Sequence, residues 1–514
     1  MASATSLREA VEPQPKNRRN VKYASTCAIL ASMVSVMFGY DIGVMSGVSL
    51  YIKKDLKITD VQLEILMGVL NLYSLIGSFA AGRTSDWIGR RYTVVLTASI
   101  FFAGALLMGF AVNYAMLMAG QLVAGVGAGY ALMIAPVYTA EISPASARGF
   151  LTSFPELLIN LGILLGYVSN YAFARLPLRL GWRVMFGVGA ALSALIAVAA
   201  LGVPESPRWL VMKGRLADAK VVLVKTSDTP EEAAARLADI KEAAGIPEDL
   251  AGDVVTVPKK HSSGEMQLWK ELVFSPTPAM RWILLAALGL NFFQQATGVH
   301  AVVLYSPRVF QSAGITDESR LLGTTCAVGV TKLLSTLVAT FLLDRAGRRP
   351  LLLSSTAGMV VSLAALGTGL AVVGHRPDAK VPWAIALCIT SILAYVSVYS
   401  VGLGPIVAVY TAEIFPLRVR ALGFALGLVC NRSIAAVVSM SFLSLSKAIT
   451  IGNIFFLYAG MAALAWVFVF TYLPETRGRT LEEMGRQFGM TDAGTEAQDA
   501  AVKDEAAEIE VPTN

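Results

Sequence analysis

The chain has 514 residues, of which 55% are hydrophobic and 15% are charged, and its mean hydropathy is +0.61. Water-soluble domains usually carry about 25% charged residues, so this composition excludes a cytosolic enzyme and a nucleic-acid-binding protein. The net charge of +6 comes largely from basic residues in short loops beside apolar segments, where they indicate membrane topology rather than an anionic ligand.

Apolar runs occur in two groups of six along the chain. The first run is too long for a cleaved signal peptide and is predicted to remain as a membrane span. Only helices satisfy every backbone amide within such continuous apolar segments, so the sequence predicts an all-α membrane protein with two six-helix bundles. The predicted spans are 23–52, 61–81, 92–112, 114–140, 150–174, 182–203, 281–311, 320–343, 350–374, 381–412, 421–446 and 451–473.

The remaining segments are polar. Residues 204–280 intersperse Lys, Arg and Glu with Ala and Leu, which predicts short surface helices, and the acidic tail is predicted to be disordered beyond about Thr491. Basic residues lie near span ends on both sides of the membrane, so the charge rule alone does not decide the orientation. With twelve spans, the N-terminal tail, this loop and the basic clusters 83–91 and 345–349 share one side, which we place in the cytoplasm together with both termini. The predicted domains are therefore the tail 1–22, the bundle 23–203, the cytoplasmic helical loop 204–280, the bundle 281–473 and the tail 474–514.

The two groups of spans are related by an internal repeat. Val137–Ile142 recurs without change as Val409–Ile414, and Asp86–Arg91 corresponds to Asp344–Arg349 in the equivalent loop of the second half. Two parallel halves of this kind are the architecture of transporters in which the substrate binds between bundles that open alternately to each side. The duplication therefore points to transport.

Charged residues are repeated together with these motifs at the inner helix ends. We predict that they form ion pairs that latch one face closed, because partly desolvated pairs persist better than exposed ones. The alternative is static anchoring of the loops. The predicted latch residues are Asp86, Arg90, Arg91, Glu141, Arg148, Asp344, Arg348, Arg349, Glu413 and Arg420.

Several motifs resemble the sugar porter family of the major facilitator superfamily over residues 24–484. They are Gly82–Arg91, Pro204–Leu210, Gln294–Gly298 and Pro474–Gly478. Within that family, Ala301–Arg308 and Phe442–Thr450 are most similar to plant polyol and monosaccharide transporters. The resemblance implies a twelve-helix fold, a central site for a neutral polyhydroxy solute and coupling to proton flow.

Asp41 lies well inside the first span, where a charged carboxylate is costly, and we predict that it carries the proton. The alternative is a permanently protonated side chain that is hydrogen-bonded to a neighbouring helix. The resemblance implies an Arg partner in the fourth span, but this chain has Gln121 there. An amide cannot favour the charged carboxylate by Coulomb attraction, so proton coupling is expected to be weakened, rewired or lost.

The resemblance places sugar-binding amides at Gln294 and Gln295, and side-chain amides suit hydroxyl groups because they donate and accept without charge. The alternative for one of them is a hydrogen bond between helices. His300 and Tyr305 follow on the same span as further substrate-contact candidates, and the alternative for His300 is a structural residue with satisfied hydrogen bonds.

Four more positions of the predicted site depart from the family or align with its binding residues. Glu156 aligns with a binding Gln, Asn431 aligns with a binding amide, Arg432 replaces an aromatic residue and Ala408 replaces a Trp. If Glu156 and Arg432 both face the cavity, they neutralise one another across the halves. Lys332 is a further cation in a span, and its role is left open between snorkelling and an unknown partner.

We therefore predict a monomeric proton-coupled symporter of the plasma membrane, with the vacuolar membrane as an alternative, that imports polyols and monosaccharides. A facilitated uniporter is the nearest alternative, because of Gln121, and a non-transporting nutrient sensor is a third. No nucleophile and base set, phosphate loop or metal-ligand cluster is evident, so we expect no enzyme activity, no cofactor and no metal.

Overall fold

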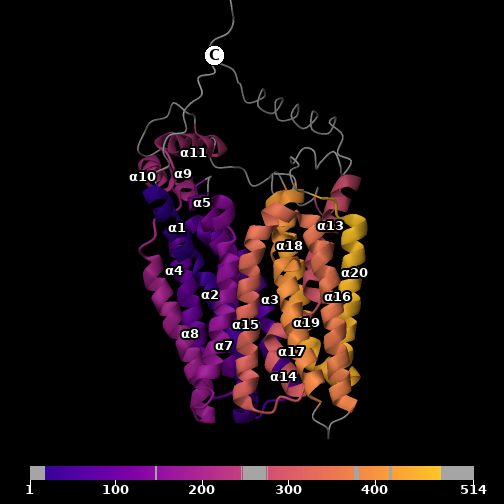
Figure 1. Ribbon diagram of the computed structural model, residues 1–514. Coiled ribbons are helices and arrows are strands. Elements are labelled where there is room, and N and C mark those ends of the chain that lie inside the picture. The colour runs from indigo at the N-terminus through magenta and orange to yellow at the C-terminus, as the bar shows by residue number, and fades with distance from the viewer. Residues whose placement is uncertain are drawn as a thin grey trace, which may run out of the picture.

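The computed structural model describes residues 18–144, 147–244, 276–375, 381–415 and 419–475, together with residues 246, 272 and 274. Twelve segments of this part are helical, long and apolar enough to cross a membrane, which confirms the predicted all-α fold. The two bundles stand side by side, the N-terminal one in indigo to magenta and the C-terminal one in orange to yellow (Figure 1). The predicted disorder beyond Thr491 lies outside the described residues.

The first six spans form the N-terminal half. Two of them begin at a side chain that caps the helix: Asn113 caps α5, and Thr59 accepts from the backbone N–H of Gln62 at 3.2 Å in a capping box. The helices of these spans are α1 (Arg18–Ser32) with α2 (Val34–Asp55), α3 (Asp60–Ile88), α4 (Arg90–Gly109), α5 (Tyr114–Ile142), α7 (Phe154–Phe173) and α8 (Leu178–Ala200).

The last six spans form the C-terminal half. Their helices are α13 (Pro278–Ala296) with α14 (Val299–Ser312), α15 (Glu318–Ala346), α16 (Arg348–His375), α17 (Pro382–Val401) with α18 (Leu403–Ile414), α19 (Arg420–Ile449) and α20 (Ile451–Tyr472).

Short helices connect the spans at one end of the molecule. They are α6 (Arg148–Leu151), α9 (Pro207–Met212), α10 (Leu216–Thr226) and α11 (Pro230–Ala243). The last three lie beyond the ends of the N-terminal bundle (Figure 1). We call this end the loop face and the opposite end, where α2 ends and α3 begins, the far face.

Two spans of the C-terminal half are broken in the middle. Gly298 has a φ of +88°, a left-handed conformation that side chains rarely adopt, and it separates α13 from α14. Gly402 separates α17 from α18. Broken helices are tolerated at membrane depth where they are buried in protein or line a cavity, so both breaks point to the interface between the halves.

Within the N-terminal half, α2 and α7 pack at very short range. A Cβ added at Gly39 would lie 1.9 Å from the carbonyl oxygen of Ile159, and one added at Gly162 would lie 2.2 Å from that of Val36. Small residues at both positions allow the two backbones to touch, as is typical of packed membrane helices. This contact fixes the helices that carry Asp41 and Glu156 relative to each other.

Contacts between the halves are strongest toward the far face, where α3 packs against α19. Asp60 of the N-terminal half lies 2.5 Å from Lys447 and 3.7 Å from Arg308, both of the C-terminal half. One turn deeper, the buried carboxylate of Glu64 accepts from the backbone N–H of Ser444 at 2.6 Å and from its hydroxyl. These bonds join the two halves at the far face, beside a hollow of about 640 Å³ that residues of both halves line.

We expect Asp60→Asn to loosen the far face, because it removes the carboxylate shared by the cations of both halves. The side chain of Lys447 is 67% exposed, so the effect should be about 1 kcal/mol, or roughly a fivefold change in the open-to-closed ratio. Spin labels at the exposed positions Val61 and Gln311, one on each half, measure the separation by double electron–electron resonance.

Lys54→Gln is the matched control, since Lys54 is an exposed cation of the same face that forms no ion pair among the described residues. An identical distance distribution in wild type and Asp60→Asn, or an equal change in Lys54→Gln, would contradict the assignment.

Candidate functional site

Two adjoining cavities lie between the halves. The central cavity has a volume of about 100 Å³, and the loop-side cavity has a volume of about 250 Å³. Both are lined by Leu132, Glu156, Ile159, Gln294, Gly404 and Arg432. Pro136, near the end of α5, and Phe424, near the start of α19, line only the loop-side cavity, so the space leads from the middle of the bundle toward the loop face.

Amide side chains form a network on one wall of the central cavity. The Nε2 group of Gln294 donates to the carbonyls of Leu403 and Gly404 at 3.1 and 2.7 Å, across the break in the tenth span. Asn431 donates to Oε1 of Gln294 at 2.5 Å and accepts from Nε2 of Gln295 at 3.1 Å. The amide of Gln294 is therefore engaged between helices.

Gln295 differs from its neighbour because one polar atom of its amide is unused. Its Oε1 atom is buried and has no hydrogen-bond partner among the described residues, and the side chain lines the central cavity. A buried acceptor without a partner is costly, so this oxygen is suited to accept a hydrogen bond from a hydroxyl group of a bound solute.

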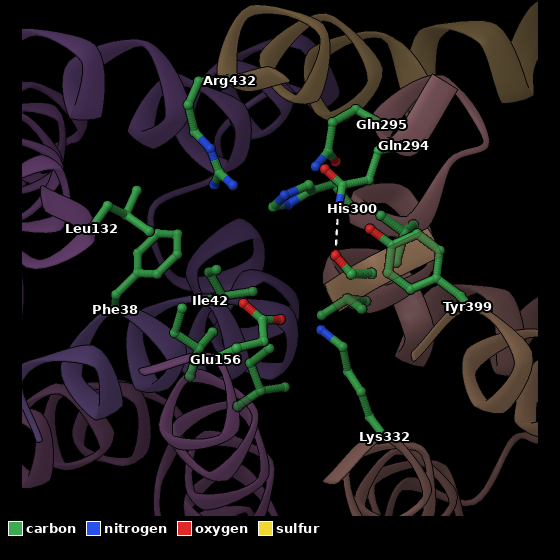
Figure 2. A pocket seen from close by; sticks show the side chains of 15 residues that line it. Phe38, Ile42, Leu132, Glu156, Gln294, Gln295, His300, Lys332, Tyr399 and Arg432 are labelled. Atoms are coloured by element: carbon green, nitrogen blue, oxygen red, sulfur yellow. Dashed lines mark hydrogen bonds between the residues drawn. The ribbon is translucent and has the colours of Figure 1, made fainter. Parts of the chain in front are cut away.

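Charged side chains from both halves face the central cavity. Glu156 of α7 comes from the N-terminal half, whereas Lys332 of α15 and Arg432 of α19 come from the C-terminal half. Figure 2 shows Arg432 and Lys332 pointing toward the open centre from opposite sides, with the carboxylate of Glu156 beside the same space. The guanidinium of Arg432 also lies over the ring of Phe38, 5.8 Å from its centroid.

The other predicted substrate residues are placed differently. His300 lines the central cavity and Ala408 lines the loop-side cavity. Tyr305 is fully buried away from both, because its hydroxyl donates to the carbonyl of Ser439 at 2.8 Å and its ring stacks on Phe442.

The sequence analysis did not single out Tyr399, which lines the central cavity from the end of α17. A tyrosine three residues before the Gly402 break was the available signal, since broken spans tend to carry the residues of a binding site.

Asp41 is buried inside the N-terminal half, 6% exposed, and lines a separate void of about 20 Å³. Tyr40, Phe101, Met108 and Phe186 line the same void, which is therefore largely aromatic and apolar. The Oδ2 atom of Asp41 has no hydrogen-bond partner among the described residues. Its neighbours Phe38 and Ile42 on α2 line the central cavity, so one helix connects the two spaces.

Gln121 makes no hydrogen bond with Asp41 in the described part of the chain. Its Nε2 group donates instead to the carbonyl of Leu66 at 3.2 Å, and its Oε1 atom is buried without a partner. No cation pairs with Asp41 either among the described residues. An isolated carboxylate in apolar surroundings is costly, which favours the neutral carboxyl in this conformation.

At the loop face, each half has the same charged cluster. Arg90 contacts Asp86 at 2.8 Å and Glu141 at 3.1 Å, and the equivalent Arg348 contacts Glu413 at 2.8 Å. Three other predicted latch arginines donate to carbonyls of their own half: Arg91 to Leu201, Arg349 to Phe470 at 2.7 Å and Arg420 to Phe415 at 3.3 Å.

In each half, a carboxylate outside the spans binds the first backbone N–H groups of the third span, which is α4 in the first half and α16 in the second. Glu205 accepts from the backbone N–H groups of Arg90 and Arg91 at 2.8 and 3.2 Å, and Glu475 does the same for the second half. Burial raises the pKa of Glu205 above its usual value, although these backbone donors oppose the shift.

Each of these contacts joins two elements of the same half, and none of them joins the N-terminal half to the C-terminal half. A latch between the halves at the loop face therefore stays a prediction for another conformation. The side chains of Arg148 and Asp344, which belong to the same prediction, lie outside the described residues.

The family model described as "Sugar (and other) transporter" matches residues 27–488. The chain belongs to this sugar transporter family. It is 60% identical to Polyol transporter 5 of Arabidopsis thaliana over 480 residues, which cover 93% of this chain and 88% of that protein. It is 32% identical to the glucose transporter GlcP of Staphylococcus epidermidis, over 89% of this chain and 95% of that one.

Solved structures agree with this membership. The partially occluded inward-open xylose transporter XylE of E. coli superposes with a TM-score of 0.74 at 26% identity, over 90% of this chain and 100% of that one. XylE bound to 6-bromo-6-deoxy-D-glucose, a proton:xylose symporter, gives a TM-score of 0.73 at 26% identity, over 91% and 100%. The predicted resemblance is confirmed, and this sugar transporter is not an enzyme.

We expect Gln294→Leu to destabilise this transporter by about 1–3 kcal/mol, because two carbonyls at the helix break lose their donor and Asn431 loses an acceptor. Thermal unfolding in detergent measures the change, with the exposed Gln311→Leu as the matched control. A Gln294→Leu protein of unchanged thermal stability that binds substrate more weakly would instead make Gln294 a substrate contact.

Proposed function

We propose that this protein imports polyols of the sorbitol and mannitol class and monosaccharides together with protons, by alternating access between the two halves. The observation that carries the proposal is the polar central cavity between duplicated bundles that are bonded together at the far face. Such a cavity at the repeat interface is where transporters of this architecture bind solute. The polyol transporter name of the Arabidopsis relative supports the substrate class.

In this proposal the protein lies in the plasma membrane, and its loop face is on the cytoplasmic side. The tails 1–22 and 474–514 and the loop 204–280 are then cytoplasmic, and the bundles 23–203 and 281–473 are the two moving units of a monomer. In this proposal the bonds across the far face and the loop-side cavity belong to an inward-facing conformation. The loop-face clusters become the latch when the halves rock to the outward-facing state.

Solute recognition is assigned to the residues that face the two cavities. Gln295 and Asn431 supply amide groups, while His300 and Tyr399 supply a ring nitrogen and a hydroxyl. Gln294 shapes the wall through the bonds that it makes across the helix break. Ala408 leaves room where a larger side chain would cover the solute, which favours flexible linear polyols.

Asp41 is the proposed proton carrier. The carboxyl group of Asp41 does not line the central cavity in this conformation. Helix α2 nevertheless connects Asp41 with that cavity, because Phe38 and Ile42 on the same helix form part of the cavity wall. A movement of α2 during rocking would expose Asp41 to one side and then the other. The proton:xylose symport of XylE supports this assignment.

A facilitated uniporter is the second candidate. It is favoured by one observation, which is that Gln121 takes the place of a cationic partner and makes no bond to Asp41 in the described part of the chain. Without a charged partner, no conformation favours the ionised carboxylate of Asp41 by Coulomb attraction; in this alternative the proton stays bound, and solute moves down its own gradient only.

We expect purified wild-type protein in liposomes to accumulate labelled sorbitol when the outside is more acidic by one pH unit. At one proton per solute, this gradient sustains about tenfold accumulation. Asp41→Asn should abolish accumulation because the amide cannot take up the proton, yet it should retain exchange of internal for external sorbitol.

Exchange serves as the internal control for folding and binding. Equal accumulation by Asp41→Asn and wild type would remove Asp41 from the mechanism. If wild-type protein exchanges sorbitol but does not accumulate it, the protein is a uniporter. If it binds sorbitol without exchange or accumulation, the protein is a non-transporting sensor.

A further inference from the structure

The wall of the central cavity carries an excess of positive charge. Among its lining residues, one carboxylate, Glu156, stands against two cations, Lys332 and Arg432, which leaves one positive charge in excess. All three side chains line the same cavity of about 100 Å³. An uncompensated charge at membrane depth is costly, and a neutral polyol brings nothing to balance it.

Arg432 is also under-used as a hydrogen-bond donor. Its Nε and Nη1 atoms are buried and have no hydrogen-bond partner among the described residues, and the guanidinium makes no ion pair there. The contact with the ring of Phe38 offsets part of the desolvation but occupies none of these donors. Buried guanidinium groups normally bind carboxylate or phosphate, often through two parallel N–H groups.

Lys332 faces the same space from the opposite wall, as Figure 2 shows, and forms no ion pair among the described residues. Glu156 is exposed to the cavity rather than bonded to either cation. It therefore does not neutralise the two cations by contact. The same wall carries the free acceptor of Gln295, which suits a hydroxyl group.

We propose that the central site also binds polyhydroxy monocarboxylates, that is, sugar acids, with the carboxylate on the unpaired donors of Arg432 and the hydroxyl groups along the amide wall. This inference rests on the proposed function, because it uses the same cavity. A bound carboxylate supplies the one negative charge that the wall lacks. Lys332 completes the attraction from the other side, and Glu156 limits it by repulsion.

D-sorbitol and D-gluconate provide a matched pair of probes, because they differ only at C1, where an alcohol is replaced by a carboxylate. D-gluconamide has nearly the same shape without the charge. Displacement of labelled sorbitol from the full-length protein in nanodiscs, at constant ionic strength, measures the affinity of each. We expect gluconate to bind about tenfold more tightly than sorbitol or gluconamide.

Two variants should change the ratio of gluconate to sorbitol affinity in opposite directions. Arg432→Gln should lower it by about tenfold to a hundredfold, since a charge-assisted pair is lost. Glu156→Gln should raise it, because the repelling carboxylate is removed. Lys332→Gln should lower it as well and provides a second variant if Arg432→Gln does not fold.

The proposal is overturned if gluconate fails to displace sorbitol at a large excess, or if the affinity ratio is the same in wild type and all folded variants. Failure of sorbitol itself to bind would instead overturn the proposed neutral substrate class. Direct calorimetry with gluconate then tests the acid site separately, so the two failures are distinguishable.

Discussion

The structure depends on one constraint, which is that polar groups placed at membrane depth must find partners inside the protein. The chain meets it for the backbone by folding into helices, and for side chains by turning many of them toward the interface between the halves. Asn160 donates to Thr336 at 2.9 Å across that interface, and Glu64 is satisfied there by Ser444. At Gln295 and Arg432 the unsatisfied atoms belong to residues that line the central cavity, whereas those of Asp41 and Gln121 lie inside the N-terminal half.

The duplicated chain forms two six-helix halves, each held together by its own ion pairs and helix contacts. Ion pairs such as Arg90 with Glu141 and Arg348 with Glu413 tie helices together within each half at the loop face. The glycine contact between α2 and α7 does the same in the N-terminal bundle. We therefore expect motion to be concentrated at the interface, where the far-face ion pairs of Asp60 are partly exposed.

Much of the fold followed from the sequence because apolar runs of sufficient length have one solution in a bilayer. The predicted sixth span, 182–203, is shifted relative to α8, Leu178–Ala200. The helix begins directly after its N-cap residue Pro177, and hydropathy alone does not locate a helix cap. The breaks at Gly298 and Gly402 were not predicted, since a single glycine leaves the hydropathy of a span unchanged.

Within the site, the sequence placed Glu156, His300 and Arg432 at the cavity, but it could not separate Tyr305 from Tyr399. Helix periodicity alone does not tell which face of a broken span meets the other half. The bonds from Asp60 to Lys447 and from Glu64 to Ser444 were missed because these partners lie in the other half, in the case of Glu64 380 residues away in the chain. A lone carboxylate inside the second span was the available signal for Glu64.

The central claim is that transport requires the two halves to separate at the far face. Cysteines at positions 60 and 447, joined by a bis-methanethiosulfonate cross-linker whose disulfides can be reduced, test it directly in liposomes, and the pair at positions 53 and 60 is the matched control because both lie in the N-terminal half. The account predicts that the first cross-link abolishes sorbitol uptake, that reduction restores it, and that the second leaves it intact. Undiminished uptake by protein fully cross-linked between positions 60 and 447 would contradict the account.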